Sequence, residues 1–133
     1  MAESHIGFAA LLLSGLILAA CQTGPGVNVP EGAASGDLEL RATGSGNWGV
    51  ACSGISTRGR EAQADIKGRG NATDVIVLND LTSATCDFSA GDAPFTLTLT
   101  ESGLACPFGA FEDGICTISI AANTSGSFEF LPE

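Results

Sequence analysis

Phe95-Thr96-Leu97-Thr98-Leu99-Thr100 is the stretch that decides the fold class of this chain. An apolar residue alternates with threonine through all six positions. A period of two places the apolar side chains on one face of a strand and the threonines on the other. Threonine is β-branched, which also favours extended backbone. The stretch therefore predicts a β-strand with one buried face.

The same alternation recurs along the rest of the chain. Further runs cover 37–41, 48–52, 61–67, 85–88, 116–120 and 128–130. The run 75–78 is apolar at every position, as a central strand covered on both faces would be. Gly, Asn and Asp separate the runs at intervals of about 8–12 residues, and no long helical period occurs. We expect an all-β domain, a small antiparallel β-sandwich or barrel of about eight short strands.

Four cysteines lie within this predicted domain, and three of them share the apolar parity of their strands. They are Cys52, Cys86, Cys106 and Cys116. Their spacing lacks the paired short gaps of zinc ligands, whereas an even number suits disulfides in a small extracytoplasmic domain. Four cysteines allow three pairings. The loop between the last two is short and contains Pro107, Gly109 and Gly114, so we expect Cys106–Cys116 and, by remainder, Cys52–Cys86.

The chain begins with a segment of a different kind. Residues 6–18 are apolar and uncharged. The segment fits the apolar core of a signal peptide and falls short of the ~20 residues that a membrane-spanning helix needs. It ends at Leu18-Ala19-Ala20-Cys21, which resembles the lipobox of bacterial lipoproteins. An ordinary secretory signal that happens to adjoin a cysteine is the alternative.

The resemblance implies how the protein would be attached to a membrane. Cys21 would receive a thioether-linked diacylglycerol, the chain would be cleaved before it, and the new amino terminus would be acylated. Gln22 stands where an Asp commonly retains lipoproteins in the inner membrane, so in a Gram-negative cell the resemblance implies the outer membrane, facing the periplasm. We expect a signal peptide at 1–20, the lipidated cysteine with a Gly- and Pro-rich linker at 21–36, and the all-β domain at 37–133.

The chain is strongly acidic, with a formal charge of −10, and removal of 1–20 takes away one acid and leaves −9. All five Lys and Arg lie between 41 and 69. Such a charge repels nucleic acid and anionic lipid surfaces, so neither is an expected partner beyond the lipid anchor itself.

Two groups of residues are candidates for binding a partner. Four cations flank the predicted strand 61–67: Arg58, Arg60, Lys67 and Arg69. The first two share a parity, as do the last two across a connecting turn, so we expect the four to converge and cluster on one face. That face would be an anion site or a solvated face paired with neighbouring acids. The second group is Phe108 and Phe111 in the 106–116 loop. These rings either anchor a partner or fold back to close the end of the core.

Catalytic chemistry is poorly represented. The chain has no Tyr, and its single histidine, His5, lies in the predicted signal peptide. Ser-His-Asp, Cys-His and histidine-metal sites are therefore excluded from the predicted mature chain. Glu112-Asp113 could bind Ca²⁺ or act as acid and base, but the pair also suits an Asp-Gly turn.

These observations lead to an expected function class rather than a reaction. We expect no enzyme, no cofactor, no metal and no small-molecule substrate. The expected role is binding or structural, in the cell envelope, with an envelope protein as partner. The alternative is a proteinaceous inhibitor of a secreted hydrolase that inserts the 106–116 loop.

Overall fold

The fold was analysed in a computed structural model, which describes residues 28–133. The predicted signal peptide, Cys21 and most of the predicted linker lie outside the described residues. Residues 28–133 contain no helix that is long and apolar enough to cross a membrane.

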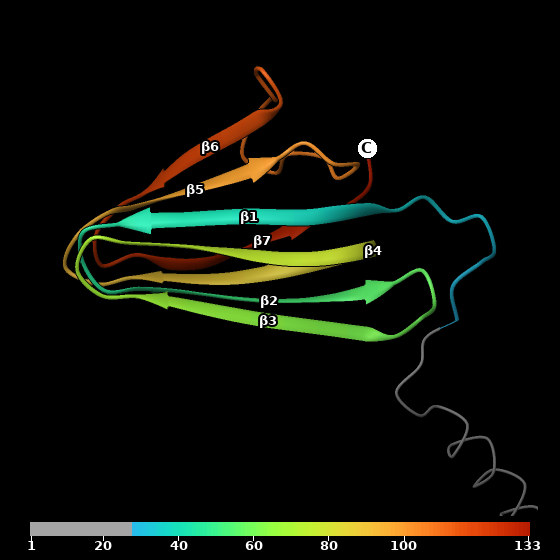
Figure 1. The fold of residues 1–133 in the computed structure, drawn as a ribbon, viewed down its shortest axis with the longest axis horizontal. Coiled ribbons are helices and arrows are strands. Elements are labelled where there is room, and N and C mark those ends of the chain that lie inside the picture. The colour runs from blue at the N-terminus through green and yellow to red at the C-terminus, as the bar shows by residue number, and fades with distance from the viewer. Residues whose placement is uncertain (1–27) are drawn as a thin grey trace, which may run out of the picture.

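The described chain is all-β and antiparallel (Figure 1). Its order along the hydrogen-bonded sheet is β3-β2-β4-β1-β5-β6, and β7 pairs with β4. The seven strands are β1 (Gly36–Gly44), β2 (Trp48–Ser56), β3 (Glu61–Gly68), β4 (Ala72–Ala90), β5 (Phe95–Thr100), β6 (Ile115–Ile120) and β7 (Ser125–Phe130). The all-β prediction is confirmed, and β5 coincides with the alternating stretch that predicted it.

Strand β4 explains why about eight strands were expected and seven are found. The sequence predicts two strands, at 75–78 and 85–88, whereas β4 is one strand of 19 residues. It doubles back near Asp80, whose φ is +56°, and Figure 1 shows its two halves running in opposite directions. Its first half pairs with β1, and its second half pairs with β2 and β7. β4 therefore joins two groups of strands. One group is β3, β2, the second half of β4 and β7; the other is the first half of β4, β1, β5 and β6.

Hydrogen bonds hold the bend in place. The Asp80 amide donates to Asp37 Oδ1 at 2.8 Å, and the Thr57 amide donates to the Asp80 carbonyl at 2.8 Å. Leu81 pairs with Gly36 in β1 and with Ser56 in β2, and its side chain is fully buried. Both ladders thus shift register at the bend, and Leu81 is paired on both sides of it.

The two groups face each other across one core. Trp48 in β2 and Phe95 in β5 belong to different groups, yet their rings stack with centroids 5.6 Å apart. All the inward-facing apolar residues form a single buried cluster. Gly68 in β3 lies against the indole, and a Cβ built on Gly68 would overlap the ring atoms Cε2, Nε1 and Cζ2 of Trp48. This packing matches a small sandwich in which one sheet folds over on itself.

The prediction that 75–78 is covered on both faces is wrong. Ile76 and Leu78 are buried, but Val77 is 55% exposed. The reason is that the core lies against one face of this group only, the face of Ile76 and Leu78. Val77 points to the opposite, outer face, which no second layer covers.

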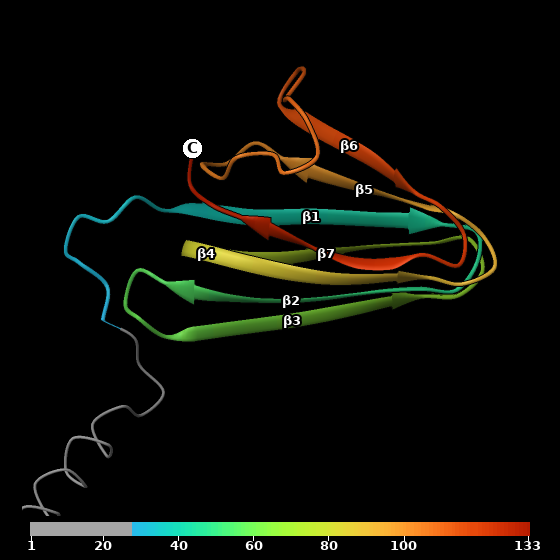
Figure 2. The ribbon, with the colours of Figure 1, turned by 180° about the vertical axis from the view of Figure 1, so that it is seen from behind.

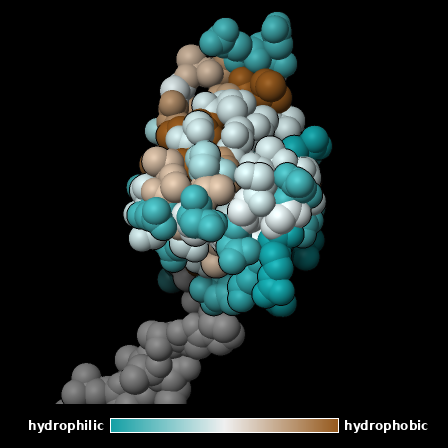
Figure 3. Space-filling model, turned by 90° about the vertical axis from the view of Figure 1, so that its left-hand side faces the viewer, coloured by the Kyte–Doolittle hydropathy of each residue, from teal (hydrophilic) through white to brown (hydrophobic). Residues whose placement is uncertain are grey.

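The two ends of the domain differ. Four loops that pass between the groups lie at one end, on the left in Figure 1, which we call the loop end; they are 45–47, 69–71, 91–94 and 121–124. The bend in β4 passes between the groups at the opposite end. Backbone hydrogen bonds join these loops, from Gly91 to Asn47 at 2.7 Å and from Asn123 to Gly91 at 2.6 Å. Hydrophilic and intermediate residues cover most of the loop end (Figure 3). Strand β1 begins at the opposite end, near the carboxyl terminus, as Figure 2 shows from behind.

Both predicted disulfides are present. Cys52 and Cys86 lie directly opposite each other in β2 and β4, and Cys106 in the loop after β5 is joined to Cys116 in β6. Cys52, Cys86 and Cys116 are buried, as their parity predicts.

Candidate functional site

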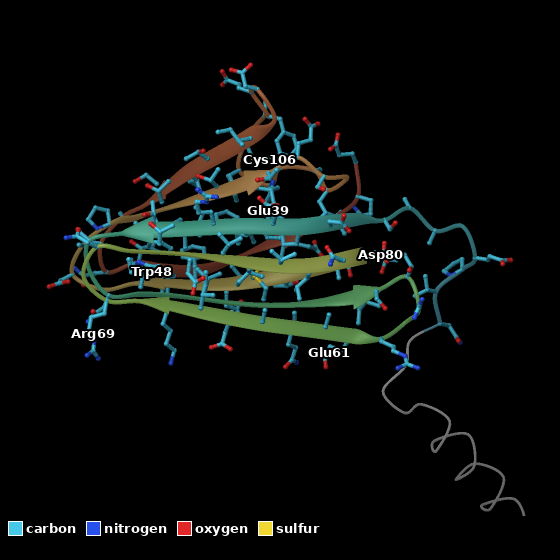
Figure 4. All side chains as sticks on the ribbon, in the orientation of Figure 1. Glu39, Trp48, Glu61, Arg69, Asp80 and Cys106 are labelled. Carbon is cyan, nitrogen blue, oxygen red and sulfur yellow. A yellow bond between two sulfur atoms is a disulfide. The ribbon has the colours of Figure 1, made fainter. Side chains whose placement is uncertain are left out.

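The four predicted cations do not form one cluster. Arg58 and Arg60 lie at the turn before β3, and Lys67 and Arg69 lie at its far end. Six residues of extended strand, 61–66, lie between Arg60 and Lys67, which places the two pairs roughly 23 Å apart. Figure 4 labels Arg69 and Glu61 at opposite ends of β3. All four cations are exposed, but the two pairs lie at opposite ends of β3, so the prediction that they cluster on one face is wrong.

The 106–116 loop folds back on the core through its aromatic residues. Phe108 lies edge-on to Phe128 of β7, with ring centroids 4.9 Å apart, and edge-on to Phe130 at 6.4 Å. Phe108 and Phe111 are both partly buried against the core cluster. Of the two readings, this packing supports the one in which the rings close the end of the core.

The tip of the same loop points outward. Glu112 and Ile115 exchange two backbone hydrogen bonds, and Asp113 and Gly114 between them both have positive φ, 55° and 81°. This is the geometry of a two-residue type I′ hairpin turn, as the Asp-Gly reading predicts. The tip projects beyond β6 at the top of Figure 1. Within 28–133, no three His, Cys, Asp or Glu side chains gather in a way that could hold a metal ion.

We expect Phe108→Ala to destabilise the domain by about 2 kcal/mol, less than a fully buried Phe would, because the ring is partly exposed but packs on two other rings. Urea unfolding of the variant measures this loss. Leu131→Ala is the control, since Leu131 is 49% exposed and should cost under about 0.5 kcal/mol. Equal unfolding midpoints for the two variants would show that Phe108 is not part of the core.

A feature that sequence reasoning missed runs along the outer face of β2. We call it the β2 groove. Its floor is formed by the outward-facing residues of β2, and its walls by their hydrogen-bonded neighbours on β3 and β4. The floor is Gly49, Ala51 and Ser53; the walls are Lys67, Asp65 and Gln63 on β3, and Ser89, Asp87 and Thr85 on β4.

The β2 groove consists of four adjoining hollows that follow the strand. From the loop end they have volumes of about 270, 260, 520 and 130 Å³. The floor residues carry little or no side chain, while the walls carry longer ones, which is why the middle strand is recessed. The largest hollow lies at Ala51, between Asp65 and Asp87.

The sequence did hold a signal for this groove. In the stretch 48–56, the inward positions alternate with three small residues in succession on the outward face, Gly49, Ala51 and Ser53. The identity of the walls was not readable, because which strands flank β2 depends on the bend in β4.

Comparison of this chain with protein-family models, with curated proteins and with solved structures gave no match.

Proposed function

We propose that this chain is an extracytoplasmic lipoprotein, anchored through Cys21 in the outer membrane and facing the periplasm, whose β domain binds an envelope protein in the β2 groove. Support for the anchor comes from the lipobox at 18–21 and from the two disulfides, which suit an oxidising compartment. These two supports for the anchor are independent of the β2 groove.

The observation that carries the binding role is the continuous groove. Four hollows in line along one strand suit an extended chain better than a compact ligand. The groove also begins at the loop end, whereas the tether enters at the start of β1, at the other end of the domain. A partner could therefore approach the groove from the loop end, opposite the start of β1, where the predicted linker joins the domain.

A second candidate function is inhibition of a secreted hydrolase. The favouring observation is the projecting 112–115 hairpin next to the Cys106–Cys116 disulfide. Its exposed tip carries Glu112 and Asp113, while Phe108 and Phe111 are held against the core, so such an inhibitor would present acids to its target rather than aromatic rings.

Site-specific photocrosslinking in intact cells tests the binding role. A photoreactive residue at Ser53, on the groove floor, should give a discrete adduct with one envelope protein. The same residue at Thr98, on the outer face of β5, is the control and should give none. The Cys21→Ala variant should lose acylation, leave the membrane fraction and lose the Ser53 adduct.

Three outcomes would contradict the proposal. Adducts from Thr98 but not Ser53 would move the binding face, and adducts from Glu112 alone would support the inhibitor. An acylation-free chain with an amino terminus away from Cys21 would remove the anchor.

A further inference from the structure

The centre of the β2 groove carries two acidic residues, one on each strand that flanks β2. Ala51 pairs with Asp65 on one side and with Asp87 on the other. Both aspartates are exposed, and they line the largest hollow of about 520 Å³ together with the small residues of the floor. Two exposed carboxylates thus flank the exposed methyl group of Ala51 on the outer face of the sheet.

The separation of these carboxylates limits what can lie between them. Their strands are two sheet spacings apart, about 10 Å. A bare metal ion needs ligand oxygens within about 2.6 Å, which two side chains from such distant backbones do not supply by themselves. A guanidinium group is planar and carries N–H donors on opposite edges, so it can donate hydrogen bonds of about 2.8 Å to one carboxylate on each side.

Charge then changes sign along the groove. Lys67 stands next along the β3 wall, at the row of Gly49, and Gln63 stands on the other side, at the row of Ser53. A second cation on the ligand would be repelled at Lys67, whereas an acid two residues along an extended segment would meet it. The groove is therefore suited to one cation at its centre rather than to a polycation.

We propose that the β2 groove binds an extended segment of a partner protein and seats one arginine side chain of that segment between Asp65 and Asp87. This inference rests on the proposed binding role and names the chemistry of the partner. The strand backbones of the groove floor are already paired on both sides, so recognition runs through side chains and not through addition of a strand.

The test uses the full chain, purified from membranes in detergent and labelled with ¹⁵N. The probe is a nine-residue peptide of glycine and serine with one central arginine, acetylated and amidated at its ends. We expect amide shifts confined to the middle of β2 and to its neighbours around Asp65 and Asp87. The same peptide with citrulline in place of arginine keeps the shape and removes the charge, and should bind at least fivefold more weakly.

The matched control separates this site from the general attraction of an acidic protein. Asp65→Asn with Asp87→Asn removes two charges from the groove, and Glu112→Gln with Asp113→Asn removes two from the hairpin tip. The groove variant should weaken peptide binding at least fivefold, and the tip variant less than twofold. Both variants should keep the wild-type spectrum elsewhere, because all four side chains are exposed.

Equal weakening by both variants, or shifts outside the groove, would overturn the inference. So would concentration-dependent self-association that protects the groove, since a second copy would then be its occupant. A Ser53 adduct in cells without peptide binding would leave the proposed function standing and reject arginine. Peptide binding without any Ser53 adduct would keep the chemical site and reject the proposed function.

Discussion

Gly68→Ala is expected to destabilise the domain by about 3 kcal/mol, the upper end of what overpacking a core costs. A Cβ at this position would overlap the Trp48 indole, which already stacks on Phe95 and is only 4% exposed. The ring has nowhere to move without opening the contact between the two groups of strands. Urea unfolding followed by fluorescence measures the loss directly, since Trp48 is the one tryptophan of the chain.

Gly49→Ala is the matched control for this substitution. Gly49 lies on the adjacent strand, and a Cβ there would meet its nearest atom, Ser89 Oγ, at an ordinary 3.6 Å. Its effect should stay within about 0.5 kcal/mol. If Gly68→Ala fails to fold, Trp48→Phe in the same chain should restore folding by making room. Equal stabilities of the two alanine variants would refute the packing described for Trp48.

Replacing Cys52 and Cys86 by alanine is expected to cost about 4 kcal/mol, against about 3 kcal/mol for replacing Cys106 and Cys116. The chain between the first pair is longer, with a sequence separation of 34 against 10, so its closure removes more entropy from the unfolded state. Cys52 and Cys86 are also both buried in the core, whereas Cys106 is partly exposed. The two losses should differ in this order.

Thermal unfolding of the two double variants, with the wild type in the oxidised and reduced states, tests that order. The reduced wild type should melt below either variant, because it lacks both closures. A larger loss from the Cys106/Cys116 variant would mean that the loop after β5, rather than the pairing of β2 with β4, limits stability.

The fold class and the disulfides were predictable because both rest on local parity. Alternation in 95–100 fixes which face of β5 is buried, and the same parity places Cys52, Cys86 and Cys116 inside. Parity carries no information on how far apart two residues lie along a strand. The parity that Arg58 shares with Arg60, and Lys67 with Arg69, therefore did not reveal that β3 holds the two pairs at its opposite ends.

The bend in β4 marks the limit of local reasoning in this chain. In the sequence, Asn79 and Asp80 break the apolar pattern between the runs 75–78 and 85–88. Whether such a break ends a strand or bends it depends on partners distant in sequence, here the Asp37 carboxylate and the Thr57 amide. The β2 groove follows from the same bend, because it brings the second half of β4 alongside β2 as a wall.

The position of β1 has a mechanical consequence. The predicted linker enters at the first residues of β1, which is bonded to β4 from Gly36 to Gly44 on one edge and to β5 from Leu40 to Gly44 on the other. Tension along the predicted linker would act nearly parallel to β1. It would therefore shear the β1–β4 and β1–β5 hydrogen bonds together instead of breaking them one at a time. If Cys21 holds the membrane and the β2 groove holds a partner, as proposed, this domain is suited to transmit force between the two without unfolding.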